Sequence, residues 1–195
     1  MTKTNTKLSF MMFIEWFIWG AWFVPLWQFL NTNGFTPTEI AWSYACTAIA
    51  AIISPILVGS ITDRFFPAQK VLSVMLLAGA VLMYFAAQQT EFSSFFPLLL
   101  LYSLTYMPTI ALTNSIAFSN VEDVERDFPR IRVLGTIGWI ASGIVCGFLP
   151  TWLGYGEISA TNIPLLVTAA SSALLGVYAL VLPNTPPKST GKLNL

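Results

Sequence analysis

Six long apolar stretches constrain this chain more than any other feature of its sequence. Together they hold 130 of the 195 residues, and only one of these 130 residues is charged, Glu15. The stretches are 8–30, 40–62, 71–87, 95–118, 133–155 and 163–182. A helix crosses the roughly 30 Å core of a bilayer with about 17–25 apolar residues. The sequence therefore predicts an all-α membrane protein with six transmembrane helices embedded in lipid.

The composition excludes several classes of protein. Charged residues make up 9% of the chain, against about 25% in soluble domains, which excludes a soluble enzyme. Histidine is absent, so serine–histidine triads and histidine metal sites are excluded, and no enzyme activity, metal or cofactor is expected. Basic residues do not cluster with aromatic ones, so no nucleic-acid partner is expected. Cys46 and Cys146 lie in apolar runs without a CxxC spacing and are predicted to be small buried residues.

The positions of lysine and arginine predict how the spans are oriented. Six spans place both ends of the chain on one side of the membrane. That side collects all nine basic residues: Lys3, Lys7, Arg64, Lys70, Arg126, Arg130, Arg132, Lys188 and Lys192. The connectors 31–39, 88–94 and 156–162 on the other side have none. Because basic residues stay in the cytoplasm, both termini are predicted to be cytoplasmic.

Local signals predict where helices begin, bend and end. Residues 36–39, Thr-Pro-Thr-Glu, form a capping box with proline at the first helical position, so the second helix should begin there. Pro25, Pro55 and Pro108 lie inside three of the stretches and are predicted to kink them. Residues 1–182 form the predicted six-helix bundle, and the proline-rich segment 183–195 is predicted to be a cytoplasmic linker.

The only charged residue within the spans is the first candidate functional group. Glu15 lies seven residues into the first span, and Trp19 and Trp22 follow it at i+4 and i+7. An ionised carboxylate facing lipid is very unfavourable, so Glu15 must face protein or water, or carry a proton. We interpret it as a candidate proton-coupling residue with Trp19 and Trp22 as cavity-lining candidates. The alternative is a structural hydrogen bond to a neighbouring helix.

The fifth span carries a second candidate group. Arg132, Thr136 and Trp139 follow i, i+4, i+7 spacing, which places a guanidinium, a hydroxyl and an indole on one helical stripe. Such a stripe can hydrogen-bond and stack a flat polar ligand. Alternatively, Arg132 is an anchor that reaches the cytoplasmic headgroups and Trp139 serves only for packing.

Polar side chains are distributed unevenly among the spans. The first, second, fourth and fifth spans carry most of them, which predicts that these four line an interior path while the third and sixth lie outside. On the fourth span Tyr102, Tyr106, Thr109 and Thr113 form a stripe, with Asn114 just beside it. Tyr106 and Asn114 are cavity-lining candidates, and hydrogen bonding between helices is an equally good interpretation of this stripe.

Four sequence stretches resemble known transporters. The connector with Gly59, Asp63 and Arg64 resembles the signature between helices two and three of the major facilitator superfamily, where it forms a gating loop. The stretches Trp19-Gly20-Ala21-Trp22, 103–109 (SLTYMPT) and 127–139 (DFPRIRVLGTIGW) resemble the nucleoside:proton symporter family within that superfamily.

This resemblance implies a fold, a substrate and a site. Members have twelve helices in two six-helix halves, with the nucleoside bound between them, so the chain resembles the N-terminal half and lacks the C-terminal one. The substrate contacts of the family correspond to Arg132, Thr136 and Trp139. The coupling ion is a proton, and Glu15 stands where well-known members have glutamine. The expected location is the bacterial inner (cytoplasmic) membrane.

Other interpretations of the sequence stay open. A transporter of the same fold with a sugar or a small organic acid as substrate would show the same spans. A complete six-span protein with a scaffold or assembly role would also fit, without transport. A half expressed alone is expected to form a homodimer, to aggregate or to need its second half.

Overall fold

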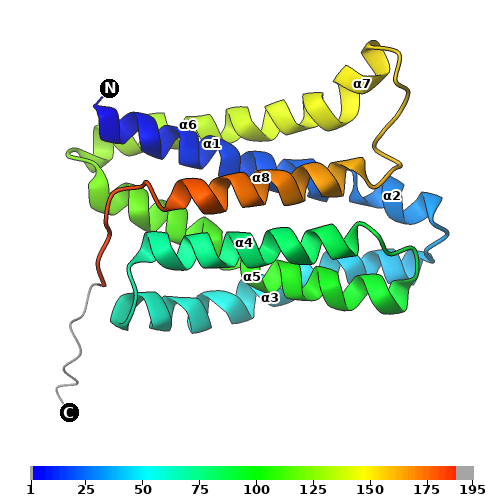
Figure 1. The fold of residues 1–195 in the computed structure, drawn as a ribbon, viewed down its shortest axis with the longest axis horizontal. Helices are drawn as coiled ribbons and strands as arrows, with labels where there is room; N and C mark the ends of the chain where they lie inside the picture. Colours follow the sequence, from blue (N-terminus) through cyan, green and yellow to red (C-terminus); the bar gives the residue numbers. More distant parts are fainter. Residues whose placement is uncertain (1, 188–195) are drawn as a thin grey trace.

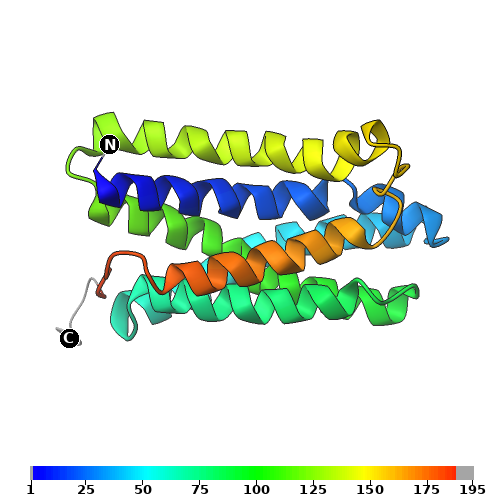
Figure 2. The ribbon, with the colours of Figure 1, turned by 45° about the horizontal axis from the view of Figure 1, so that its top comes forward.

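The chain forms a bundle of long helices that run up and down side by side (Figures 1 and 2). The structure is a computed structural model that describes residues 2–187, without the side chains of residues 55–57 and 59–64. The helices are α1 (Lys3–Phe23), α2 (Leu26–Thr32), α3 (Pro37–Arg64), α4 (Ala68–Ala86), α5 (Phe92–Asn120), α6 (Val124–Gly143), α7 (Leu149–Trp152) and α8 (Ile163–Ala179). A π-helical turn, Ile144–Phe148, joins α6 to α7.

Each predicted span corresponds to a helix or to a helix with a break. The first span is divided into α1 and α2 at Val24 and Pro25, so the predicted kink at Pro25 is a complete interruption. Pro108 lies inside α5, which continues through it. The capping box is confirmed: the backbone N–H of Thr36 donates to the Glu39 carboxylate at 2.8 Å, and the Glu39 N–H donates to the Thr36 hydroxyl at 3.3 Å.

The fifth helix begins much earlier than residue 133, where its apolar stretch begins. The Asp123 carboxylate accepts the backbone N–H of Arg126 at 3.0 Å and caps α6. The first turn of α6 is acidic, which suits a helix N-terminus. Because it contains few apolar residues, hydropathy alone does not detect it. Arg132 therefore lies in the third turn of a helix and not at its edge.

Four helical segments within the described residues are long and apolar enough to cross a membrane. They are Lys3–Thr32, Ala68–Ala86, Phe92–Asn120 and Val124–Trp152. The helix α8 is also apolar but shorter, and part of α3 has no described side chains. The expectation of six spans therefore stays a prediction.

The two ends of the bundle differ in charge. The N-terminus, the end of α8 and the connectors before α4 and α6 lie at one end, which we call the basic end because Lys3, Lys7, Lys70, Arg126 and Arg130 belong to it (Figure 1). The opposite end holds α2, α7 and the connector between α4 and α5. The described chain thus begins and ends at the same end of the bundle (Figure 1).

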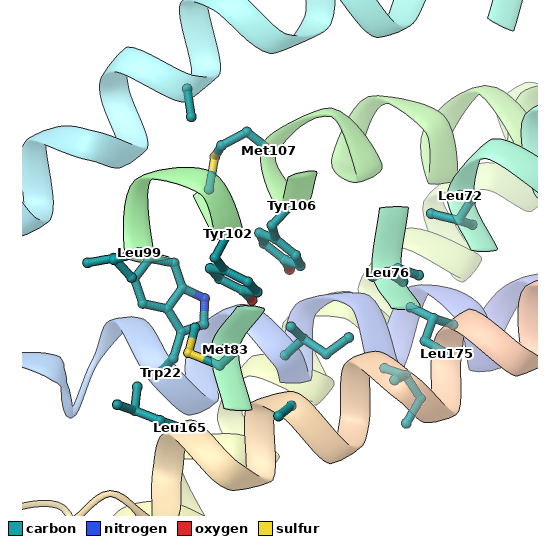
Figure 3. Packing of buried hydrophobic residues seen from close by; sticks show 14 of the residues in the cluster. Trp22, Leu72, Leu76, Met83, Leu99, Tyr102, Tyr106, Met107, Leu165 and Leu175 are labelled. Carbon is teal, nitrogen blue, oxygen red and sulfur yellow. The ribbon is translucent and has the colours of Figure 1, made fainter. Parts of the chain in front are cut away.

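The packing places α1 in the middle of the bundle. It contacts α6, α8 and α5, while α4 packs between α8 and α5, and α3 packs on α5. Leu72, Leu76, Met83 and Leu175 are among the side chains that fill the core between these helices (Figure 3). The two cysteines are buried and unpaired, as predicted.

Within this chain α6 lies at one side of the bundle (Figure 2). α6 is the least buried of the four long segments, and Val133, Ile137 and Ile140 on it are exposed. The number of polar residues in a span indicates whether the helix carries functional groups. It does not indicate how many other helices pack against that helix. α6 has one major neighbour here, α1.

Glycine allows α1 and α6 to approach closely. A Cβ atom on Gly138 would collide with the backbone carbonyl of Phe13, and one on Gly20 would collide with the hydroxyl of Ser142. A Cβ atom on Gly135 would lie 2.6 Å from the ring of Trp16. Side chains with a Cβ atom would therefore push the two helices apart, as expected for small residues in a membrane helix interface.

The first residues of the predicted linker are fixed to the bundle. The backbone N–H of Thr185 donates to the Gln69 side chain at 2.9 Å, and the Thr185 carbonyl accepts from the N–H of Ala68 at 3.0 Å. The Asn120 amide donates to the Thr185 hydroxyl at 2.8 Å. Thr185 thus packs against the bundle, beside the start of α4 and the end of α5.

The close contact of α1 with α6 predicts unequal effects of two glycine substitutions. Gly138→Ala forces a methyl group against a backbone carbonyl that cannot rotate away, and it should destabilise the bundle by about 1–3 kcal/mol. Gly143→Ala on the same helix meets nothing within 4 Å and should leave stability unchanged or slightly raised. Thermal unfolding of the purified protein in detergent measures both. Equal melting temperatures for the two variants would contradict the close approach.

Candidate functional site

A pocket of about 210 Å³ lies between α1 and α6 and is the candidate site. Its lining consists of Trp16, Trp19, Arg132, Thr136 and Trp139. The structure thus brings together all three predicted binding residues of the fifth span and one of the cavity-lining candidates of the first. Thr136 is exposed while Arg132 and Trp139 are half-buried, so the pocket is open toward the outside of this bundle.

Arg132 is held by an aromatic ring and has no ion-pair partner in the described part of the chain. Its guanidinium carbon lies 3.9 Å from the centre of the Trp16 ring, a cation–π contact. Such a contact uses the flat face of the guanidinium and leaves its N–H donors free at the edge. Arg132 can therefore present a planar set of donors to a ligand in the pocket.

Three indoles form the apolar wall of the pocket. The rings of Trp16 and Trp19 lie 5.2 Å apart, and those of Trp19 and Trp139 lie 5.6 Å apart and almost perpendicular. Trp16 and Trp139 approach to 6.5 Å. Aromatic walls of this kind bury a flat ligand by stacking or edge contacts, and polar groups at the rim then fix its orientation.

Trp16 is the functional candidate that the sequence did not reveal. A signal for it exists, because Trp16 and Trp19 are three residues apart and therefore neighbours on one helix surface. The i, i+4, i+7 spacing from Glu15 groups Trp19 with Glu15 and Trp22 instead. Only the position of α6 decides which side of α1 faces the pocket.

Glu15 lies on a different side of α1 and does not line this pocket. Its side chain is fully buried and faces α5, where the Thr109 hydroxyl donates to Oε1 at 2.7 Å. The Tyr106 hydroxyl donates to the Glu15 backbone carbonyl at 2.6 Å. The second carboxyl oxygen, Oε2, has no hydrogen-bond partner among the described residues.

The three residues predicted to share one face of the first helix are therefore divided. Trp22 is buried beside Tyr102 of α5, with ring centres 5.5 Å apart, while Trp19 contacts Trp139 of α6. Positions 19 and 22 differ by about 300°, or 60° around a helix of 3.6 residues per turn. Because α1 lies between α5 and α6, this angle is enough for the two indoles to contact different neighbouring helices.

The polar stripe of α5 is buried in the bundle. Tyr102, Tyr106, Thr109 and Thr113 are all buried. The contacts of Tyr106 and Thr109 with Glu15 match the interpretation as hydrogen bonding between helices. Asn114 is half-buried, its side-chain oxygen has no partner among the described residues, and it is not part of the pocket lining.

The predicted gating residues Gly59, Asp63 and Arg64 lie outside the residues whose side chains the structure describes. They belong to the last part of α3, which ends at Arg64.

A larger pocket, of about 570 Å³, lies at the basic end between the beginnings of α1 and α6. Two of its three charged side chains are engaged with each other, since Arg126 is ion-paired to Asp127 at 2.9 Å, and Arg130 is the third. Its lining contains no aromatic side chain. The smaller pocket combines a guanidinium and a hydroxyl with three indoles, and these aromatic surfaces make it the better candidate for a flat ligand.

The sequence matches the model of a known family, described as nucleoside H+ symporter, over residues 2–195. The chain belongs to this family. Within it, the chain is 78% identical over 193 residues to the "Putative nucleoside transporter YegT" of Escherichia coli K12, covering 99% of this chain and 45% of that protein. It is 31% identical to the nucleoside permease NupG of the same organism, covering 92% of this chain and 43% of NupG.

The fold agrees with that of a solved nucleoside transporter. The crystal structure of the nucleoside transporter NupG superimposes with a TM-score of 0.85 at 30% identity, covering 95% of this chain and 45% of the NupG chain. The chain therefore has the fold of about half of that transporter. It likewise spans about half the length of the relatives that it matches.

Proposed function

We propose that this chain is the N-terminal half of a proton-coupled nucleoside transporter that works by alternating access. The observation that carries the proposal is the pocket with Arg132, Thr136 and Trp139 on one wall and two indoles on the other. Family membership and the half-length match support it. In such a carrier one half rocks against the other around a central site.

The pocket suits one part of a nucleoside site. The indoles of Trp139 and Trp19 offer surfaces for a flat base, and the Arg132 donors and the Thr136 hydroxyl can hydrogen-bond its polar edge or the ribose. Ligand pockets commonly have about 300–1,000 Å³, so 210 Å³ is small for a complete site. The remaining wall would come from a second six-helix half on the open side of the pocket.

Glu15 is the proposed proton-coupling residue. It is the only acidic residue within the six predicted spans, and it is buried with one carboxyl oxygen unpaired. A carboxyl group in this position can be neutral while the core is closed and ionised when water reaches it. No cofactor besides the proton enters this mechanism.

The proposed orientation has both termini and the basic end in the cytoplasm, in the inner membrane of a bacterium. The described lysine and arginine side chains at the basic end support it through the tendency of basic residues to stay inside. Gly59, Asp63 and Arg64 would form a gating loop at this end, an assignment that rests on the resemblance alone.

The exposed apolar face of α6 suggests where the second half packs. Val133, Ile137 and Ile140 are exposed next to the pocket stripe, and lipid or another six-helix unit would cover them. A chain of this length on its own would leave this face to lipid, to a second copy in a homodimer, or to aggregation.

An aromatic organic acid is the second candidate substrate. A guanidinium without an ion-pair partner beside three indoles also suits a carboxylate on an aromatic ring. A more distant relative, 24% identical, is the "Probable 3-phenylpropionic acid transporter" of Escherichia coli K12. A nucleoside is favoured by the family match and by the two more similar relatives, and nothing in the pocket favours the sugar alternative or a scaffold role.

Substitutions in the pocket test the proposed substrate site in the complete two-half carrier. Arg132→Ala and Thr136→Ala should each abolish uptake of labelled uridine while the amount of carrier in the membrane stays normal, because both side chains project into the pocket. Excess unlabelled nucleoside should compete with uridine in the parent carrier, whereas glucose and 3-phenylpropionate should not. Normal uptake in both variants, or competition by the acid alone, would refute the proposal.

Glu15→Gln tests proton coupling. Glutamine keeps the size and the acceptor for Thr109 but cannot release a proton, so uridine accumulation should lose its dependence on an imposed pH gradient while nucleoside exchange across the membrane persists. Uptake measured at several external pH values in vesicles shows this directly. A variant with the same pH profile as the parent would make Glu15 a structural residue.

A further inference from the structure

Four buried polar groups, one on Glu15 and three around it, lack hydrogen-bond partners among the described residues. They are the Glu15 Oε2 atom, the Tyr102 hydroxyl, the Trp22 indole N–H and the Ser172 hydroxyl. All four side chains are essentially inaccessible to solvent, with exposed fractions of 0–1%. They come from three helices, since Glu15 and Trp22 belong to α1, Tyr102 to α5 and Ser172 to α8.

These groups form one neighbourhood in the core. The Tyr102 and Tyr106 rings stack in parallel, with centres 5.7 Å apart, and the Trp22 ring meets Tyr102 edge-on (Figure 3). The Tyr106 hydroxyl is bonded to the Glu15 carbonyl. The Glu15 carboxyl and the Ser172 hydroxyl both lie near the Tyr102 hydroxyl, although no hydrogen bond of good geometry joins them to it. We call Glu15, Tyr102, Trp22 and Ser172 the buried polar cluster.

An unpaired buried polar group costs about 1–3 kcal/mol, so a cluster of four calls for a partner. The indole N–H can only donate, an ionised carboxylate can only accept, and the hydroxyls do both. Water donates two and accepts two hydrogen bonds and can satisfy all of these groups. A metal cation cannot, because the indole N–H would point its positive end at the ion.

We propose that Tyr102 and Ser172, together with water that enters the buried polar cluster, form a proton relay to Glu15. In each hop an oxygen accepts a proton on one lone pair and gives up its own proton to the next oxygen. The last acceptor is Oε2 of Glu15, and the proton comes from bulk water. The inference rests on the proposed function, since it assigns the access route of the proposed proton-coupling group.

The placement of the cluster gives the relay a direction. α5 runs from Phe92 at the end opposite the basic end to Asn120 at the basic end. Tyr102 is seven residues before Thr109, the partner of Glu15, and therefore lies about 10 Å closer to that opposite end. The relay thus connects Glu15 with the side that the basic residues avoid, from which a symporter takes up its proton.

Other ionisable groups around Glu15 are few. On α5 these are Tyr102 and Tyr106, and α2 and α8 contain no aspartate, glutamate, lysine or arginine. α6 presents Arg132 on the Trp16 side of α1. The carboxyl groups of α6, Glu125 and Asp127, lie in its first turn at the basic end. Since α2, α5 and α8 carry no carboxyl or imidazole group, a relay to Glu15 has to use hydroxyl groups and water.

Tyr102→Phe and Ser172→Ala separate a relay from a packing role. Both remove a hydroxyl that has no partner within the described structure and keep the rest of the side chain, so they should leave thermal stability unchanged or slightly raised. The matched control is Tyr178→Phe, which removes the hydroxyl of a half-buried tyrosine that donates to the Lys7 carbonyl at 3.3 Å.

The measurement compares two transport modes of the complete carrier in vesicles. Uphill uridine uptake driven by a pH gradient requires proton transfer, whereas exchange of internal for external uridine does not require net proton movement. A positioned proton-transfer group commonly raises the rate of a reaction at least about a hundredfold. Because water can partly replace a missing hydroxyl, Tyr102→Phe should slow uphill uptake by a smaller factor, about tenfold. Ser172→Ala should act in the same direction. Exchange should stay at the parental rate in both variants, and Tyr178→Phe should change neither mode.

Two results would overturn the relay. Parental rates of uphill uptake in both Tyr102→Phe and Ser172→Ala would show that the hydroxyls carry no protons. Equal losses of uphill uptake and exchange would show a packing role. Failure of the proposed function would give different results. Arg132→Ala would then leave uridine exchange intact, or Glu15→Gln would leave the pH dependence of uptake unchanged.

Discussion

The close approach of α1 and α6 is the contact on which the candidate site depends. Gly138 lets the backbone of α6 meet the Phe13 carbonyl, and Gly135 makes room for the Trp16 ring. Only at this distance can Trp16 lie under the Arg132 guanidinium, 3.9 Å away. The glycines are therefore part of the site although they contribute no functional group, because they bring the indole stripe of one helix against the polar stripe of the other.

The central helix α1 serves two purposes on two of its sides. Toward α6 it contributes Trp16 and Trp19 to the pocket, and toward α5 it contributes Glu15, bonded to Thr109. In the proposed carrier, one rigid helix would therefore touch both the substrate and the proton-binding group. Any rotation or bending of α1 would act on both, which is a simple physical basis for coupling. The interruption at Pro25, at the end of the same helix, provides a place for such bending.

Much of the fold could be predicted because only a few kinds of backbone structure can cross a membrane. Six apolar stretches correspond to the observed helices, and the capping box at Thr36 set the start of α3 correctly. The beginning of α6 was wrong by about nine residues because its first two turns are polar. The i, i+4, i+7 stripe of Arg132, Thr136 and Trp139 was placed together because it lies on one helix. Trp16 was missed, and Trp19 separated from Glu15, because these depend on which helices flank α1, and no spacing within one segment contains that information.

The most direct measurement is a structure of the complete two-half carrier with bound uridine. The account predicts that the base stacks against Trp139 or Trp19 and that the Arg132 guanidinium donates to uridine at about 2.7–3.2 Å, with Trp16 still beneath it. Uridine bound away from the α1–α6 pocket, or an Arg132 side chain turned to the lipid headgroups, would contradict it.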